Sequence, residues 1–262
     1  MSELLVFDVH GYVAHFRRVD STTTALTYGF PPRTTIIGMI AAMLGMPRDS
    51  YYDEFAPEKC RIAVSVMSRN RRIFLKQKYI NTKYLNELQL RGVGKFRPTA
   101  LQNIQLLVPD KFDNPLHFRI FFFHKDRELM DELERRIRRR RFRCPISLGP
   151  AYCLASASFV DSPSFESLEM NEAAHINTVI PVTKIAGREW AGKNRDVRIY
   201  REGPMPVHFA CESVKRKTYR RIVGVESYIY TEGGEGIAVK PKGEIFRCDL
   251  EGRSFLGIFM AR

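Results

Sequence analysis

The chain has 262 residues, of which 44% are hydrophobic, enough for a sizeable core, and this composition excludes an intrinsically disordered protein. Its 42 lysines and arginines outnumber its 29 aspartates and glutamates, and the formal net charge of +13 favours a polyanionic partner such as nucleic acid or a membrane surface. No apolar run approaches the ~18 to 20 residues that cross a bilayer, and the first residues lack a secretory signal pattern, so we expect a cytoplasmic protein with no membrane contact.

The first predicted strand spans residues 4–16, where apolar and mixed side chains alternate. The segment 27–45 (TYGFPPRTTIIGMIAAMLG) then runs from polar, aromatic and basic residues into an apolar helix. Thr34 or Thr35 is the expected N-cap. Because the first amides of a helix lack intrahelical partners and the dipole favours anions, Arg33 beside them predicts a phosphate site. A capped core helix without a ligand is the alternative.

A second predicted strand at 60–67 leads into a long basic insertion. Residues 69–111 hold ten basic side chains and two acidic ones, and Tyr79, Tyr84 and Phe96 interleave with these charges. This mixture is typical of a projection that follows a nucleic-acid backbone and stacks on bases, whereas a solvated hairpin is the alternative.

The next elements are a strand at 117–124 (HFRIFFFH), a helix that opens at Asp126 and a strand at 151–160. The resulting order, strand, helix, strand, strand, helix, strand, is that of the ferredoxin-like (RRM-like) fold, in which two helices cover one face of an antiparallel four-stranded sheet. The sequence therefore predicts an α+β, ferredoxin-like N-terminal domain at 1–160, with a thumb insertion at about 69–116.

The densest basic tract extends from Arg135 to Arg143. Glutamates and aspartates one helical turn earlier can neutralise its first half through i,i+4 pairs. The arginines at the end of the tract have no such partners, and they could bind a phosphate, bind an acidic protein surface or interact with the dipole of the helix. The unneutralised arginines are Arg139, Arg140, Arg141 and Arg143.

Beyond residue 160 the composition becomes polar and acidic, which predicts a linker at 161–175. A β-rich C-terminal subdomain at 176–262 is expected to follow, with a topology that the sequence leaves open. Its strand candidates are 177–185, 206–211, 221–230, 236–240, 244–248 and 254–260.

The cysteines and histidines give no metal pattern. The five cysteines are odd in number and widely spaced, which indicates reduced thiols rather than a disulfide framework. Neither a CxxC pair nor an HxxxH spacing occurs, so we expect no metal and no cofactor.

Three segments, FPPRTTIIGMIAAMLG, KFRPTALQNIQLLVP and SLGPAYCLA, together resemble the CRISPR-associated Cas five family of the RAMP superfamily. The resemblance covers residues 1 to 160 well and the remainder loosely, and the absence of other domains is similar to the type I-B branch. It implies a noncatalytic subunit of the Cascade surveillance complex that caps the 5′ handle of the crRNA in antiviral defence. The implied partners are the crRNA, the Cascade backbone subunits and the large subunit, and the remaining basic surface can also meet target DNA.

The resemblance places candidate RNA contacts in two regions, the start of the first helix and the thumb. Handle recognition needs splayed bases stacked on Tyr or Phe, phosphates at the helix start and contacts to 2′-hydroxyls. The candidate RNA-binding residues are Arg17, Arg18, Tyr28, Phe30, Arg33, Thr34, Thr35, Arg91, Lys95, Phe96 and Arg97.

Two other functions remain open. One branch of the resembled family is a metal-independent endoribonuclease that processes precursor crRNA, and here His124 beside Lys125, or His10, would supply the base. A scaffold that binds acidic proteins is the third reading. Such a scaffold would respond to loss of Arg and Lys rather than to loss of aromatic side chains.

Overall fold

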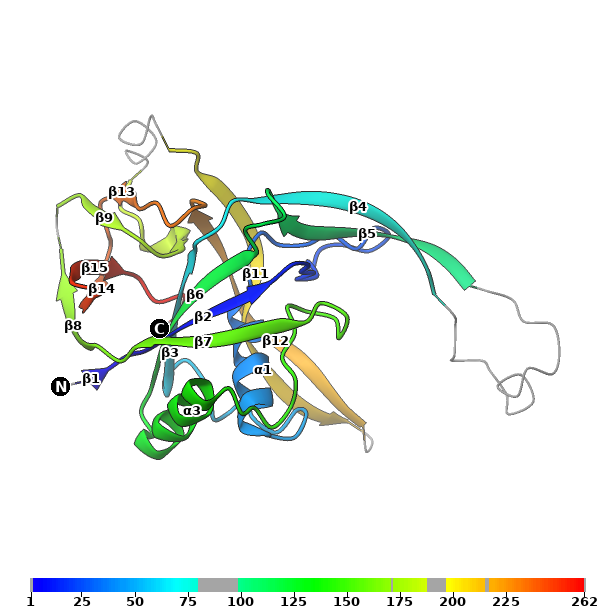
Figure 1. The fold of residues 1–262 in the computed structure, drawn as a ribbon, viewed down its shortest axis with the longest axis horizontal. Helices are drawn as coiled ribbons and strands as arrows, with labels where there is room; N and C mark the ends of the chain where they lie inside the picture. Colours follow the sequence, from blue (N-terminus) through cyan, green and yellow to red (C-terminus); the bar gives the residue numbers. More distant parts are fainter. Residues whose placement is uncertain (1, 80–98, 171, 188–196, 215–216, 262) are drawn as a thin grey trace.

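Several antiparallel sheets and few helices make up the computed structural model, which describes residues 2–79, 99–170, 172–187, 197–214 and 217–261 (Figure 1). The central sheet has four strands, each antiparallel to its neighbours. In spatial order these are β3 (Cys60–Val66), β6 (Leu116–His124), β2 (Leu5–Gly11) and β7 (Ala155–Asp161).

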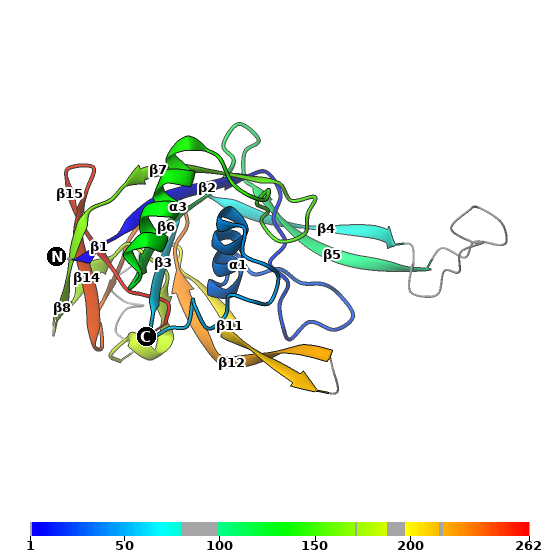
Figure 2. The ribbon, with the colours of Figure 1, turned by 90° about the horizontal axis from the view of Figure 1, so that it is seen from below.

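Two helices, α1 (Arg33–Leu44) and α3 (Arg127–Arg139), lie on one face of the central sheet (Figures 1 and 2). As predicted, Asp126 caps α3, because its carboxylate accepts hydrogen bonds from the amides of Glu128 and Leu129. The N-cap expected at Thr34 or Thr35 is wrong, since α1 begins earlier, with Pro32 as N-cap and no side-chain cap. Proline suits a helix start because its φ is already helical.

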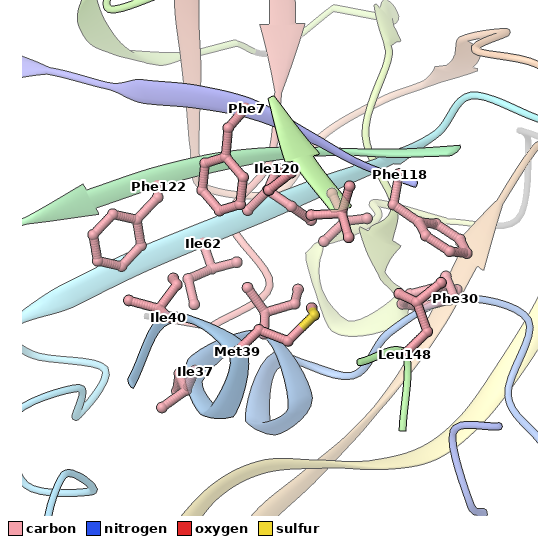
Figure 3. Close-up of a cluster of buried hydrophobic side chains, with 14 of the residues drawn as sticks. Phe7, Phe30, Ile37, Met39, Ile40, Ile62, Phe118, Ile120, Phe122 and Leu148 are labelled. Atoms are coloured by element: carbon pink, nitrogen blue, oxygen red, sulfur yellow. The ribbon is translucent and has the colours of Figure 1, made fainter. Parts of the chain in front are cut away.

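The main core lies between these helices and the sheet. Figure 3 shows side chains of α1 and of the strands meeting there, and Phe7, Ile40, Ile62, Ile120 and Phe122 are at most 1% exposed. Burial of each such side chain contributes about 1.5 to 3 kcal/mol, so this layer supplies much of the stability.

The opposite face of the central sheet is partly covered by a second four-stranded sheet. Phe121 stacks on Phe255 with ring centroids 4.6 Å apart, and Leu4 and Val6 pack against Phe246 in the same cluster. The covering sheet has the spatial order β1 (Ser2–Glu3), β8 (Ser164–Glu169), β14 (Glu244–Leu250) and β15 (Arg253–Gly257). The N-terminal strand β1 therefore pairs with a strand beyond residue 160.

The segment 161–175, expected to be a strand-poor linker, instead holds β8 and the start of β9 (Ala174–Ile176). Its polar side chains occupy a half-exposed strand, which explains why composition alone suggested a loop. Five of the six strands predicted further on are present, whereas 177–185 holds only the two residues of β10 (Ile180–Pro181) and then the 3₁₀ helix η2 (Val182–Lys184). The five fall in β11 (Tyr200–Val214), β12 (Lys217–Tyr230), β13 (Ile237–Val239), β14 and β15.

A two-stranded hairpin of β4 (Asn70–Tyr79) and β5 (Thr99–Pro109) extends away from the body of the protein (Figures 1 and 2). It lies within the insertion that the sequence predicts. Arg91, Lys95, Phe96 and Arg97 fall outside the described residues. Among the described helices, none is long and apolar enough to cross a membrane.

Candidate nucleic-acid interface

Arg33 does not face an anion site, because its side chain is buried in the core with 1% exposed surface. The guanidinium donates to the carbonyl oxygens of Phe55 at 2.8 Å and of Cys60 and Val207 at 3.2 Å each. Burial lowers the pKa of Arg33, and no carboxylate within the described ranges forms an ion pair with it. In this structure Arg33 ties three backbone segments together instead of contacting phosphate directly.

Tyr28 and Phe30 are likewise buried rather than presented for base stacking. The Tyr28 hydroxyl donates to the carbonyl of Pro204, and the Phe30 ring lies edge-on to Tyr228 and Tyr230, with centroids 5.8 and 5.0 Å away. The sequence analysis expected these aromatic side chains to be exposed, but β11 and β12 cover the 27–33 segment.

Arg17 and Arg18 differ in their availability. Arg18 is engaged internally, since it pairs with Asp20 at 2.8 Å and lies 3.8 Å from the buried carboxylate of Glu202. Arg17 is exposed and lines a groove. Of the two predicted contacts, only Arg17 presents a guanidinium that an added ligand can reach without breaking an ion pair.

The groove has a volume of about 700 Å³. Its walls come from the 15–28 segment, the first turns of α1, residues 51–52, the loop at 145–152 and the β11–β12 hairpin. Thr34 and Thr35 lie on the α1 wall and are partly exposed. These two predicted contacts and Arg17 are therefore brought together, whereas Arg33 lies behind them in the core.

Aromatic rings and a second arginine complete the groove. Tyr51 and Tyr52 lie with ring centroids 4.8 Å apart, Tyr52 lies 5.9 Å from Phe209, and Tyr152 is 51% exposed on the loop wall. Tyr52 is buried, but the rings of Tyr51, Tyr152 and Phe209 are at least partly exposed and can stack on bases, and the nearby guanidinium of Arg220 can meet a backbone phosphate.

Asp49 orients the Arg220 side of the groove. The Arg220 Nε donates to Asp49 at 2.6 Å, and the Tyr52 hydroxyl donates to the same carboxylate oxygen at 2.7 Å. These two hydrogen bonds lower the pKa of Asp49, while burial and Asp49 itself raise the pKa of Tyr52. Near neutral pH Asp49 is therefore ionised beside the groove, and within the groove Tyr52 is neutral and Arg220 is held in place.

The base of the β4–β5 hairpin also carries basic and aromatic side chains. Arg72 is tied to Glu202 by an ion pair, while Phe74 is 65% exposed and Lys76 lies two residues further along the same strand. Side chains two apart in a strand point to the same side, so Arg72, Phe74 and Lys76 share one face.

Among the residues that the structure describes, one cluster has metal-ligand chemistry: Asp8, His10 and His117 offer ligand atoms within 4.8 Å of one another. Arg119 binds both carboxylate oxygens of Asp8, at 2.8 and 3.0 Å. Burial alone would raise the pKa of Asp8, but hydrogen bonds from His117 and Arg119 lower it to about 2. Because a guanidinium already occupies the carboxylate, we read this cluster as a polar network of the sheet and not as a metal site.

His124, the first candidate for a catalytic base, is buried. Its Nε2 lies 3.0 Å from the Glu54 carbonyl, and its Nδ1 accepts from the Asp126 amide at 3.0 Å. Both ring nitrogens are thus used internally, although Lys125 beside it is exposed. The other candidate, His10, is half-buried and contacts His117 with ring centroids 4.3 Å apart.

Sequence reasoning missed most of the aromatic groove residues. Tyr51 and Tyr52 lie only seven positions beyond the end of α1, so the YY pair was a weak local signal. Phe209 and Arg220 belong to a hairpin some 170 residues away, and no local pattern connects them with α1. The residues added by the structure are His15, Tyr51, Tyr52, Tyr152, Phe209 and Arg220.

Comparison with solved structures finds several distant likenesses. The chain is similar to a crystal structure of a CRISPR protein from Archaeoglobus fulgidus, with 14% identity, a TM-score of 0.48 and coverage of 98% of this chain and 99% of that one. It is also similar to a chain of a CRISPR RNA-guided surveillance complex, with 12% identity, a TM-score of 0.48 and 91% of each chain covered. At these TM-scores the likenesses carry no functional argument.

The comparison with protein families is more decisive. None of the curated proteins compared with the chain matches it. The family model described as CRISPR-associated protein (Cas_Cas5) matches residues 4–187, well over half of the sequence. The chain therefore belongs to the CRISPR-associated Cas_Cas5 family.

Proposed function

We propose that this protein is a noncatalytic RNA-binding subunit of a type I CRISPR Cascade complex, acting in the cytoplasm, which holds the 5′ handle of the crRNA in the groove beside α1. Family membership supports the CRISPR role, and the net charge of +13 supports a polyanionic ligand. The proposed partners are the crRNA, the Cascade backbone subunits and the large subunit, with target DNA as a further ligand of the basic surface.

The observation that carries the proposal is the composition of the groove walls. Within about 700 Å³ they combine the guanidinium groups of Arg17 and Arg220, the hydroxyls of Thr34 and Thr35, and the at least partly exposed rings of Tyr51, Tyr152 and Phe209. Single-stranded RNA is held by this combination of cations for phosphates, aromatic faces for bases and hydroxyls for sugar contacts.

We interpret the central sheet with α1 and α3 as a ferredoxin-like, RRM-like domain at 1–160. The spatial order β3–β6–β2–β7 and the antiparallel pairings support this reading. In the same reading, β4 and β5 form the base of the thumb, and residues 176–262 form a β-rich subdomain. Arg91, Lys95, Phe96 and Arg97 stay proposed contacts in the insertion that these two strands carry.

The proposal is tested by salt-titrated binding of labelled crRNA with a native or scrambled 5′ handle, using the lone protein and the co-expressed complex. We expect preference for the native handle and no cleavage. Arg17→Ala should weaken binding and reduce the slope of log K against log salt by about 0.7, one phosphate contact of a single strand.

A matched control is Arg135→Ala, which removes the same charge from an arginine that is paired with Glu132 on α3. It should leave the salt slope unchanged. Equal binding of native and scrambled handles, together with an Arg17→Ala slope equal to that of the control, would reject handle capping in this groove.

Metal-independent cleavage of precursor crRNA is the second candidate, and the contact between His10 and His117 favours it. Two imidazoles 4.3 Å apart can supply a base and an acid for attack by a 2′-hydroxyl. Burial lowers the pKa of His10, which keeps it in the neutral form that a base requires. Cleavage in the presence of a chelator that is lost in His10→Ala would place this function first.

A further inference from the structure

We propose that four arginines at the C-terminal end of α3 and just beyond it, Arg139, Arg140, Arg141 and Arg143, extend the groove as a second contact for the RNA backbone. This inference rests on the proposed function. The four residues, called the arginine tract below, would bind RNA phosphates beside the groove whatever the RNA sequence. All four side chains are exposed. Among the described residues, none of them forms an ion pair with a carboxylate, whereas Arg135 and Arg136 pair with Glu132, and Arg138 pairs with Glu134.

The arginine tract leads directly into the wall of the groove. The amides of Arg143 and Cys144 donate to the carbonyls of Met43 and Ala42 at 3.1 Å each, so the chain leaving α3 is fastened along the end of α1 (Figure 1). Ala42 and Pro145 both line the groove. Two residues span at most about 7 Å, so Arg143 stands at the rim of the groove.

The helix dipoles neutralise only part of the positive charge of the arginine tract. The C-termini of α1 and α3 both end here, and each is equivalent to about half a negative charge. Together they offset roughly one of the four positive charges. About three guanidinium charges remain exposed and unneutralised, which is the surface that a polyanion recognises.

The backbone conformation of Arg140 also supports the proposal. It is the C-cap of α3 with φ 50° and ψ 37°, a left-handed conformation that glycine adopts readily and that is less favourable for a residue with a Cβ atom. The corresponding C-cap of α1 is Gly45, with φ 79°. An arginine in place of glycine at this position indicates that the side chain has a use that outweighs the conformation.

Arg143 is held in place by the same glycine. A Cβ atom added at Gly45 would lie 2.8 Å from both the Cβ and the Cγ of Arg143, so the arginine stem packs directly on the end of α1. Its guanidinium is thereby directed from a fixed stem instead of a flexible loop. The two helix ends thus provide a rigid platform for the arginine tract.

The test uses the full chain and two labelled oligouridines, a short one of about eight nucleotides and a long one of about sixteen, because single-strand sites span roughly this range. We expect the long RNA to bind more tightly and with a steeper salt slope. Arg140→Gly should lower the salt slope for the long RNA by about 0.7, whereas the melting temperature should stay level or rise because glycine suits the left-handed backbone.

Arg135→Ala is the matched control and should change neither slope. Replacement of Arg139, Arg140 and Arg141 together should remove most of the advantage of the long RNA and leave the short RNA unaffected.

If these variants bind the long RNA like the wild type while Arg17→Ala weakens the short RNA, the proposal for the arginine tract is rejected and the proposal for the groove stands. If Arg17→Ala has no effect while the tract variants weaken the long RNA, the groove proposal fails and the arginine tract stands. Loss of polyglutamate binding without loss of RNA binding would reject the RNA assignment in favour of an acidic protein partner.

Discussion

Arg33 and Cys60 contact each other twice in the core. The Arg33 Nη2 donates to the Cys60 carbonyl oxygen at 3.2 Å and lies 3.3 Å from the Cys60 Sγ. The same nitrogen donates to the Phe55 carbonyl, and Nη1 reaches Val207 on β11. One side chain at the start of α1 therefore joins the loop before β3, the start of β3 and β11.

Replacement of Arg33 should affect stability before it affects RNA binding. Arg33→Lys keeps the charge, but a single ammonium cannot serve three carbonyls with the geometry of a guanidinium. We expect a loss of about 1 to 3 kcal/mol, because buried carbonyls are left without donors. Thermal unfolding measures this loss, and RNA affinity per folded molecule should be unchanged. Normal stability with weaker RNA binding would return Arg33 to the RNA interface.

Asp8 should stabilise the protein above its unfolded pKa and lose that contribution in acid. Its pKa falls from 3.8 to about 2 in the folded protein, since hydrogen bonds from His117 and Arg119 outweigh the effect of burial. The folded state therefore binds its proton less readily, and stability decreases as the pH falls from about 4 through 2. The contribution at neutral pH is roughly 2 kcal/mol.

Asp8→Asn should be less stable at neutral pH and show a flatter loss of stability between pH 4 and 2, as urea unfolding at several pH values would reveal. Asp20→Asn is a suitable comparison, because Asp20 also has a lowered pKa but lies at the surface beside Arg18. Equal pH profiles for the Asp8 variant and the wild type would contradict the prediction.

Tyr152 should contribute to RNA binding through stacking. Tyr152→Ala is expected to weaken binding by about 1 to 3 kcal/mol, the range measured for loss of one base–aromatic stack. The loss should persist at high salt, since stacking does not release counterions. Tyr152→Phe keeps the ring and should bind like the wild type. A loss seen only at low salt would indicate an electrostatic scaffold instead.

Leu133 should be a purely structural residue. It is fully buried between α3 and the sheet, and Leu133→Ala should cost about 2 to 5 kcal/mol through the cavity that it leaves. Leu154→Ala is the control, because Leu154 is 68% exposed and a surface change of this kind usually stays within about 0.5 kcal/mol. Melting temperatures would separate the two, and RNA binding by the folded fraction should match the wild type in both.

Local patterns in the sequence predicted most elements well. Asp126 followed by leucines at helical spacing marked α3, and the run HFRIFFFH marked β6, because capping and side-chain periodicity act between residues close in the chain. The expectation that 161–175 is poor in strands was wrong for the same reason. A half-exposed strand such as β8 looks like a loop until its partners β1 and β14 are known.

The amino-acid sequence was sufficient to establish the basic character of the chain, the two helices and the strands that flank them, the projecting insertion without its strands β4 and β5, and the family resemblance that the family match confirms. These properties depend on composition and on short-range spacing. The burial of Tyr28, Phe30 and Arg33, and the meeting of Arg17, Thr34 and Thr35 with Phe209 and Arg220, followed only from the packing of the β11–β12 hairpin against α1. The exposure of the residues at the start of α1 depends on the element that packs against them. That element is the β11–β12 hairpin, which lies about 170 residues further along the chain.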